Sequence, residues 1–219
     1  MRKVAVALGA FVFLAFALGI VACKPEAEPA ARVTPTPTPA VGRLSDMLGR
    51  AARIASVKYD QVITISEMPT YTQKVWIKGK KIRVERPVLG TWQVLILNRE
   101  TQRVYRYIPD MNYATGGSGG EIRGHPTQAL TFPTEWIEVI LTSRPVVMGT
   151  ETVDGKVSLV VEFAGSKAWI WEEYGLVIRM EYVTPNRTTT IQWKDVEFVD
   201  IPDSIFELPA GVPIEGMGM

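Results

Sequence analysis

The side chains that could carry out chemistry are few and widely separated along the chain. The 219 residues include one histidine, His125, beside glycine and proline, and one cysteine, Cys23. A lone histidine provides neither a metal cluster nor a proton relay through a second imidazole. The pair Glu172 and Glu173 would project to opposite faces of a strand, whereas in a turn both carboxylates would be solvated. We therefore expect no catalytic residue, no metal site and no cofactor; a hydrolase that uses His125 is the enzymatic alternative.

The single cysteine follows an apolar segment at the N-terminus. Arg2 and Lys3 precede the uncharged residues 4–22, a length that suits either a secretion signal or a spanning helix. The sequence Ile-Val-Ala-Cys that ends at Cys23 resembles the bacterial lipobox, in which the cysteine receives a diacylglyceryl thioether and the chain is cut before it. The resemblance implies a lipoprotein signal peptide over 1–22 and a lipidated Cys23. A plain membrane anchor with an incidental cysteine is the alternative.

The segment after the cysteine has no hydrophobic rhythm. Residues 23–42 contain the repeat TPTPTP, which favours extended, polyproline-like backbone. We expect this segment to be a tether of at most about 60 Å between the membrane and a folded domain over 43–219. That domain has the ordinary composition of a globular protein, with 47% hydrophobic and 21% charged residues in the whole chain. The net charge is +1 and no basic block occurs, so we expect no binding to nucleic acid.

Apolar periodicity predicts the elements of this domain. Helical spacing indicates a helix over 44–56, and alternating apolar residues then indicate about five strands. The glycine-rich residues 111–124 predict a mobile loop, and the apolar residues 126–143 predict a helical region that Pro133 interrupts. About five more strands follow, with tight turns at Asp154-Gly155 and Tyr174-Gly175.

Because no strand–helix–strand alternation appears, a parallel sheet is disfavoured. We predict the α+β class, with a large antiparallel sheet of about ten or eleven strands. So wide a sheet must curl into an open half-barrel, and helices would cover its concave face.

Four sequence marks together resemble the LolA/LolB-like lipoprotein-carrier superfamily. They are QKVWIKGKKIRVE (73–85), GTETVDGKVSLVVEF (149–163), AWIWEEYGLVIRMEY (168–182) and SIFELPAGVPI (204–214). The superfamily includes mycobacterial lipid-carrying lipoproteins and the N-terminal module of RseB. The resemblance implies an apolar cavity that holds acyl chains or lipidated proteins, in a lipid-anchored protein of the bacterial cell envelope. A sensor that binds an envelope protein partner, as in RseB, is the alternative.

The alternation on the strands and the strongly apolar second helical region provide candidate residues that could line such a cavity. Trp136 is the strongest of the six tryptophans, since a helix over a concave sheet has few other places to direct an indole. The alternative is that these side chains only pack in the hydrophobic core and line no cavity. The candidates that we expect to face inward are Tyr59, Ile63, Val75, Ile77, Ile82, Val84, Trp136, Ile140, Leu176, Ile178 and Met180.

Overall fold

A computed structural model describes residues 38–118 and 135–216 of the chain. These residues all belong to one compact unit, Thr36–Met219. Among them, no helix is both long enough and apolar enough to cross a membrane. The predicted signal peptide, Cys23 and His125 lie outside the described residues.

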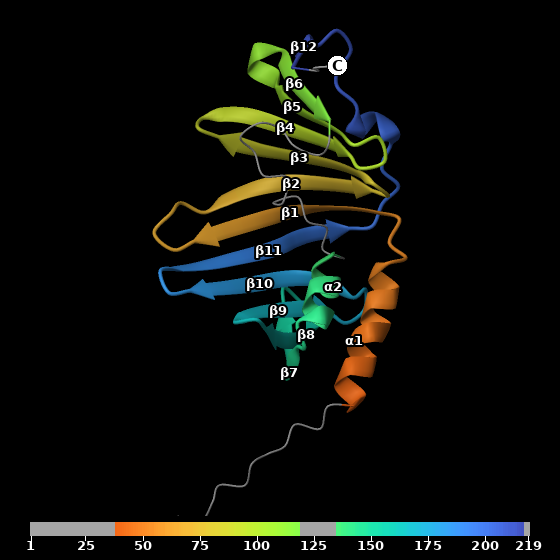
Figure 1. Ribbon diagram of the computed structural model, residues 1–219, viewed down its shortest axis with the longest axis vertical. Helices are drawn as coiled ribbons and strands as arrows, with labels where there is room; N and C mark the ends of the chain where they lie inside the picture. Colours follow the sequence, from red (N-terminus) through yellow and green to blue (C-terminus); the bar gives the residue numbers. More distant parts are fainter. Residues whose placement is uncertain (1–37, 119–134, 217–219) are drawn as a thin grey trace, which may run out of the picture. The chain divides into compact units, whose positions relative to one another are not determined.

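The unit is built on a single twelve-stranded sheet (Figure 1), whose strands follow the order β12-β6-β5-β4-β3-β2-β1-β11-β10-β9-β8-β7. Neighbouring strands of this sheet pair in antiparallel fashion, except for a short parallel pairing between β12 and β6. The open, curved antiparallel sheet predicted from the sequence is therefore confirmed. The first six strands are β1 (Ser56–Ile65), β2 (Tyr71–Lys78), β3 (Lys81–Val88), β4 (Thr91–Asn98), β5 (Arg103–Ile108) and β6 (Tyr113–Ser118).

Strands β7 to β11 follow helix α2 (Glu135–Thr142) along the chain and form a meander, whereas the two-residue β12 pairs with β6 at the opposite edge of the sheet. The predicted turns at Asp154-Gly155 and Tyr174-Gly175 are both present, since the glycines at 155 and 175 adopt the positive φ that such turns require. The strands are β7 (Val146–Val153), β8 (Lys156–Phe163), β9 (Ser166–Trp171), β10 (Leu176–Thr184), β11 (Arg187–Glu197) and β12 (Ile214–Glu215).

Two short strands account for the difference between the predicted and observed strand number. The glycine-rich segment was expected to be a loop from residue 111, but Tyr113–Ser118 forms β6 against β5. A backbone ladder needs no side chain, so a partner strand can order glycines that carry no local pattern. Strand β12 consists of two residues and pairs with β6 across about a hundred residues of sequence. Residues 119–134 of the predicted loop and helical region lie outside the described residues.

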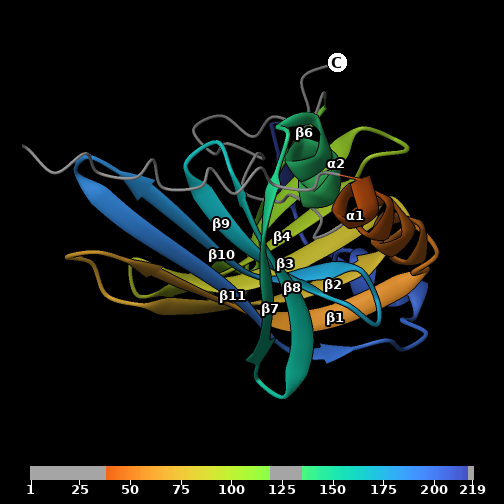
Figure 2. The ribbon, with the colours of Figure 1, turned by 90° about the horizontal axis from the view of Figure 1, so that it is seen from below.

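Two α-helices pack on one side of the sheet. Helix α1 (Thr38–Ala51) buries Leu44, Met47 and Ala51 at helical spacing, and helix α2 (Glu135–Thr142) buries Ile140. Both helices contact each other and β10, and Figure 2 shows them together on the concave side of the sheet. Helix α1 begins and ends several residues earlier than predicted, because Ser56 already belongs to β1.

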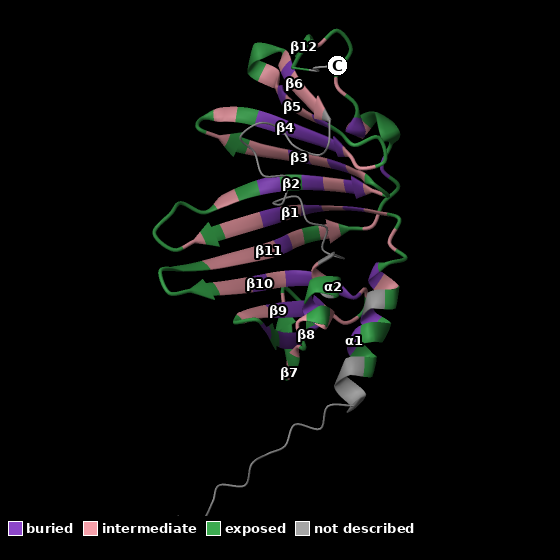
Figure 3. Ribbon diagram, in the orientation of Figure 1, coloured by how far each residue is buried: buried purple, intermediate pink, exposed green. Residues whose placement is uncertain are grey.

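The two faces of the sheet have separate apolar cores. The main core lies on the inner face, which we define as the face that carries Tyr59, Val75 and Val84, and it includes both helices. A smaller core on the outer face contains Val94 and Ile96 and is covered by the C-terminal segment. Strand β4 contributes to both cores and is buried on both faces (Figure 3), as its unbroken apolar run predicts.

The C-terminal segment, residues 199–215, crosses the outer face of β2, β3 and β4 as a strap. Its 3-10 helix, η3 (Asp203–Phe206), buries Phe206 against the outer core. Basic side chains of the sheet hold its backbone: the Lys78 ammonium donates to the Ile201 carbonyl at 2.7 Å and the Arg83 guanidinium to that of Ile205 at 3.0 Å. The strap therefore seals the outer face of the strands whose inner face forms the main core.

Candidate functional site

Most of the predicted inward-facing side chains lie together on the inner face. Cross-strand pairs align them in two rows, one through Val57, Ile77, Ile82 and Leu97 and the next through Tyr59, Val75, Val84 and Leu95. Apolar pairs of this kind stabilise a sheet and produce one continuous apolar surface. The predicted residues in the main core are Tyr59, Val75, Ile77, Ile82, Val84, Ile140, Leu176 and Met180.

Two further candidates lie at the margin of this surface. Ile63 is half-buried and pairs with Tyr71 of β2 and Ile191 of β11. Trp136 is partly buried against the main core, and its ring centroid lies 5.7 Å from that of Tyr182 on β10. The inner face thus continues from β1 beneath α2.

The prediction that Ile178 faces inward is wrong. Its side chain belongs to a separate cluster with Val160 and Trp169, whereas Val177 lies in the main core. The pairing of β10 with β9 shifts register between Val177 and Arg179, and such a bulge reverses the alternation of the strand. Simple alternation from Met180 backwards therefore assigns residue 178 to the wrong face.

The six tryptophans occupy different environments. Trp193 is buried in the main core, and Trp136 lies at its edge. Trp169 and Trp171 belong to the cluster around Ile178, where the Lys167 ammonium and the Arg179 guanidinium lie over the Trp169 ring at 5.0 and 4.6 Å. Trp76 packs against the outer core and Trp92 is exposed. Trp136 and Trp193 are the two that share the inner face with the predicted candidates.

Sequence reasoning missed the polar side chains on the inner face. Gln61 pairs with Gln73 of β2 and with Trp193 of β11, and the Gln73 amide donates a hydrogen bond to the Gln61 carbonyl. On β3 and β4, Arg86 and Gln93 form the corresponding pair. The alternation of each strand contained the signal that was missed. Gln73, Arg86 and Gln93 each lie two residues from an apolar residue of the inner face on the same strand, so they face the same side. Those apolar residues are Val75, Val84 and Leu95, respectively.

The next two strands extend this polar region. Arg106 of β5 pairs with Leu95 of β4 on one side and with Thr115 of β6 on the other. We call Gln73, Arg86, Gln93, Arg106 and Thr115 the polar patch. Each of its members has a buried side-chain nitrogen or oxygen that finds no hydrogen-bond partner among residues 38–118 and 135–216.

Burial has different electrostatic consequences for a phenol and for a guanidinium on this face. Desolvation raises the pKa of Tyr182 well above its usual range, so the phenol stays neutral and its hydroxyl lies 3.3 Å from the Met180 sulfur. Burial lowers the pKa of Arg86 from its ordinary value, against the opposing influence of Tyr71. The apolar surface is thus uncharged around β10 and carries cationic groups around β3 and β5.

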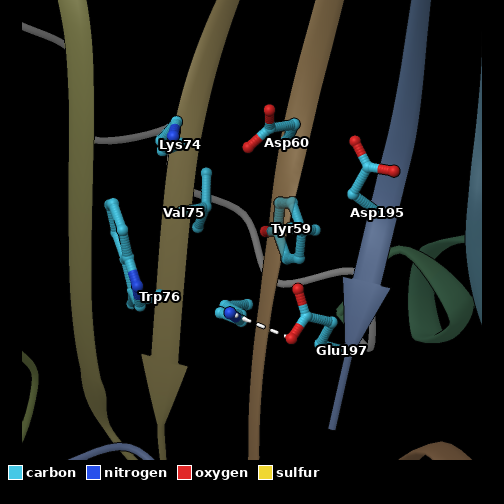
Figure 4. Close-up of a pocket in the computed structure, with 8 residues that line it drawn as sticks. Tyr59, Asp60, Lys74, Val75, Trp76, Asp195 and Glu197 are labelled. Carbon is cyan, nitrogen blue, oxygen red and sulfur yellow. Dashed lines mark ion pairs between the residues drawn. The ribbon is translucent and has the colours of Figure 1, made fainter. Parts of the chain in front are cut away.

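A hollow of about 250 Å³ lies over β1, β2 and β11 (Figure 4). It forms where β11 has one extra residue between Lys194 and Glu197, with Asp195 at φ 49°. The Lys58 ammonium lies 2.9 Å from the Glu197 carboxylate, and both side chains are well exposed. Side chains of both charges line the hollow, which suits neither an acyl chain nor an anion. Its lining residues are Lys58, Tyr59, Asp60, Lys74, Val75, Trp76, Asp195 and Glu197.

Of the two adjacent glutamates, Glu172 serves the structure of the helix junction. Glu172 and Glu173 lie in the turn between β9 and β10, and the Glu172 carboxylate lies 2.6 Å from the Arg43 guanidinium of α1. The Arg50 guanidinium donates to the Glu172 carbonyl at 2.6 Å. Within residues 38–118 and 135–216, no three metal-ligating side chains come together.

Three solved structures align with most of this chain. An uncharacterised conserved protein from Thermus thermophilus aligns with a TM-score of 0.52 and 9% identity, over 78% of this chain and 96% of that chain. LprF from Mycobacterium bovis aligns with a TM-score of 0.49 and 10% identity, over 81% and 99%. A LolA superfamily protein from Nitrosomonas europaea aligns with a TM-score of 0.38 and 13% identity, over 75% and 97%.

Comparison of the sequence with family models and with curated proteins gives no match. At 9–13% identity the structural likeness concerns the fold alone. The likeness to the Thermus thermophilus protein is one of fold, an open and curved antiparallel sheet.

Proposed function

We propose that this protein is a lipid-anchored lipoprotein of the bacterial cell envelope that binds acyl chains or lipidated molecules against its inner face, without catalysis. One observation carries the proposal: the apolar inner face is contributed by nine strands, β1–β5 and β8–β11, while the described helices on it are 14 and 8 residues long. An apolar surface of this extent suits a chain of methylene groups, each worth about 0.8 kcal/mol when buried.

The edge of α2 offers the clearest place to test acyl-chain binding. Trp136 contacts both the Tyr182 ring and the main core, whereas Val139 on the same helix is 45% exposed. Trp136→Ala removes apolar contact area at the inner face, and Val139→Ala removes a similar kind of surface that faces solvent. The first change should weaken binding of a fluorescent fatty acid several-fold, and the second should leave it unchanged.

The experiment combines two measurements on the full-length protein. Lipid extraction and mass spectrometry of protein purified from its own host should identify bound lipid, and titration with the fluorescent fatty acid should saturate at one site or a few. Thermal unfolding of both variants checks that each is folded at the assay temperature. A protein that carries no lipid and does not bind the probe would contradict the proposal.

A further inference from the structure

The polar patch interrupts an otherwise apolar surface with strong hydrogen-bonding groups that lack partners in the part of the chain that the structure describes. Gln73 and Gln93 are only 3% and 8% exposed, yet their side-chain oxygens accept no hydrogen bond from any described residue. The Nε atoms of Arg86 and Arg106 and the hydroxyl of Thr115 are buried in the same way. An unsatisfied buried polar group costs about 1–3 kcal/mol, so five on one face need a compensating partner.

The charges of the patch are also uncompensated among the described residues. No carboxylate from 38–118 or 135–216 lies within 4.0 Å of either arginine, although Arg83 and Arg179 of the same sheet each have a glutamate partner on the outer face. Arg86 and Arg106 lie on strands separated only by β4, about 10 Å apart across the sheet, and their partners on β4, Gln93 and Leu95, put them two residues, or about 7 Å, out of step along the strands. Two guanidinium groups at this separation can converge on one anion from both sides.

The position of the patch within the apolar surface defines the shape of its ligand. The rows through Tyr59 and Val57 run from the patch across β2 and β1, and the apolar residues of β8–β10 and α2 continue beyond them. A ligand seated on the arginines would therefore have an apolar chain in one direction along the inner face. Its head group would need anionic oxygens for the guanidinium groups.

We infer that the polar patch is a head-group site for anionic amphiphiles, in which Arg86 and Arg106 bind a carboxylate or phosphate while the acyl chain lies on the apolar rows. This inference rests on the proposed function and adds the ligand class to it. The sheet then selects lipids by charge as well as by apolar volume. A purely apolar cavity discriminates only weakly among ligands, whereas a buried charged pair rejects a neutral head group.

The test uses two probes that differ only in charge: dansyl-undecanoic acid and its methyl ester. Full-length protein in a non-ionic amphipol is titrated with each, and the ratio of their dissociation constants is the measured quantity. The wild-type protein should bind the acid about tenfold tighter or more, as expected for charge-assisted hydrogen bonds. Arg86→Gln and Arg106→Gln should each reduce this ratio towards one without weakening the ester, and Arg86→Lys should retain part of it.

Arg103→Gln is the matched control, because Arg103 lies on β5, is exposed and points away from the inner face that Val104 occupies. This variant should keep the wild-type ratio. Competition separates the possible sources of the anion: dodecyl phosphate should displace the acid probe, and inorganic phosphate at the same concentration should not.

The outcomes distinguish this inference from the function on which it rests. Equal binding of acid and ester by the wild type, or a ratio that both glutamine variants leave unchanged, would overturn the head-group site alone. Displacement by inorganic phosphate as effective as that by dodecyl phosphate would overturn the amphiphile and leave a simple anion site. Failure of the wild type to bind either probe would contradict acyl-chain binding as well.

Discussion

Gly175 lies where α1 meets the sheet and has no room for a side chain. A Cβ atom built on this residue would lie 1.8 Å from the Met47 carbonyl oxygen and 2.6 Å from its carbon, both backbone atoms of α1. Its φ of +70° is in the region that favours glycine. The close approach brings the turn between β9 and β10 directly under the helix, where Arg43 and Arg50 also bind Glu172.

Gly175→Ala should therefore destabilise the protein far more than an ordinary turn substitution. Positive φ costs an alanine about 1–2 kcal/mol, and displacement of α1 adds a similar amount or more, so we expect a loss of roughly 2–5 kcal/mol in the free energy of unfolding. Gly155→Ala is the matched control, because Gly155 has a φ of +75° but nothing within 4 Å of its built Cβ. Urea unfolding of the full-length variants measures the difference. Equal losses would show that contact with Met47 contributes nothing.

At the scale of elements, local pattern predicted the hairpins and failed where long-range pairing decides the structure. Apolar alternation and turn residues lie within a few positions of each other, so the strands around Gly79 and Gly155 were predictable. Strand β6 was not, because its glycines carry no pattern and its order comes from β5 and β12. The inward assignment of Ile178 failed for a related reason: a bulge is a property of two paired strands and cannot be inferred from one.

The residues of the candidate site were also predictable only in part. Apolar positions such as Val75 and Val84 were predictable from alternation because burial of one face imposes it. The polar patch consists of residues from five strands that meet only through the register of the whole sheet. Each residue alone looks like a solvated side chain on a strand. Only the pairing of Arg86 with Gln93, beside Gln73 and Arg106, makes them one surface.

The strap over the outer face provides a prediction about pH. Asp203 lies 3.0 Å from the Lys81 ammonium and 3.8 Å from that of Lys78, and the hydrogen bond with Lys81, followed by the charge of Lys78, lowers the pKa of Asp203 from its usual value. A carboxyl whose pKa is lower in the folded state stabilises the protein above the pKa of the unfolded chain. That contribution is lost as the pH falls through the folded value, which places the loss below about pH 4.

Asp203→Asn should lower the urea midpoint at pH 7, and the difference from the wild type should shrink as the pH falls below about 4. The effect should be small and sensitive to salt, because the carboxylate is exposed. Asp110→Asn, on an exposed residue of the 3-10 helix η1 (Pro109–Met111), provides the control. A midpoint difference that stays constant from pH 7 to pH 3 would show that the lysines do not act on Asp203 through its charge.

At the scale of the whole molecule, the length of chain between Cys23 and α1 would limit what a lipid-anchored protein could exchange. The described unit begins its first helix at Thr38, so residues 24–37 separate Cys23 from α1. At about 3.1 Å per residue, this segment spans at most about 45 Å when fully extended. If Cys23 is lipidated, the inner face can receive or deliver an amphiphile only within that distance of its own membrane. Transfer to a more distant membrane would then require a partner protein.

Cys23→Ala tests the anchor independently of the ligand. Lipidation at Cys23 predicts that the wild-type protein begins at a cysteine that carries the mass of a diacylglyceryl group, and that the variant loses both this mass and the cut before residue 23. Val33→Ala, within the same segment, should leave both properties unchanged. Binding of the fatty-acid probe should survive in Cys23→Ala, because every residue assigned to the inner face lies after residue 43. Wild-type protein that keeps residues 1–22 and carries no diacylglyceryl mass would instead support a plain membrane anchor, and would remove the lipid tether from the proposed function.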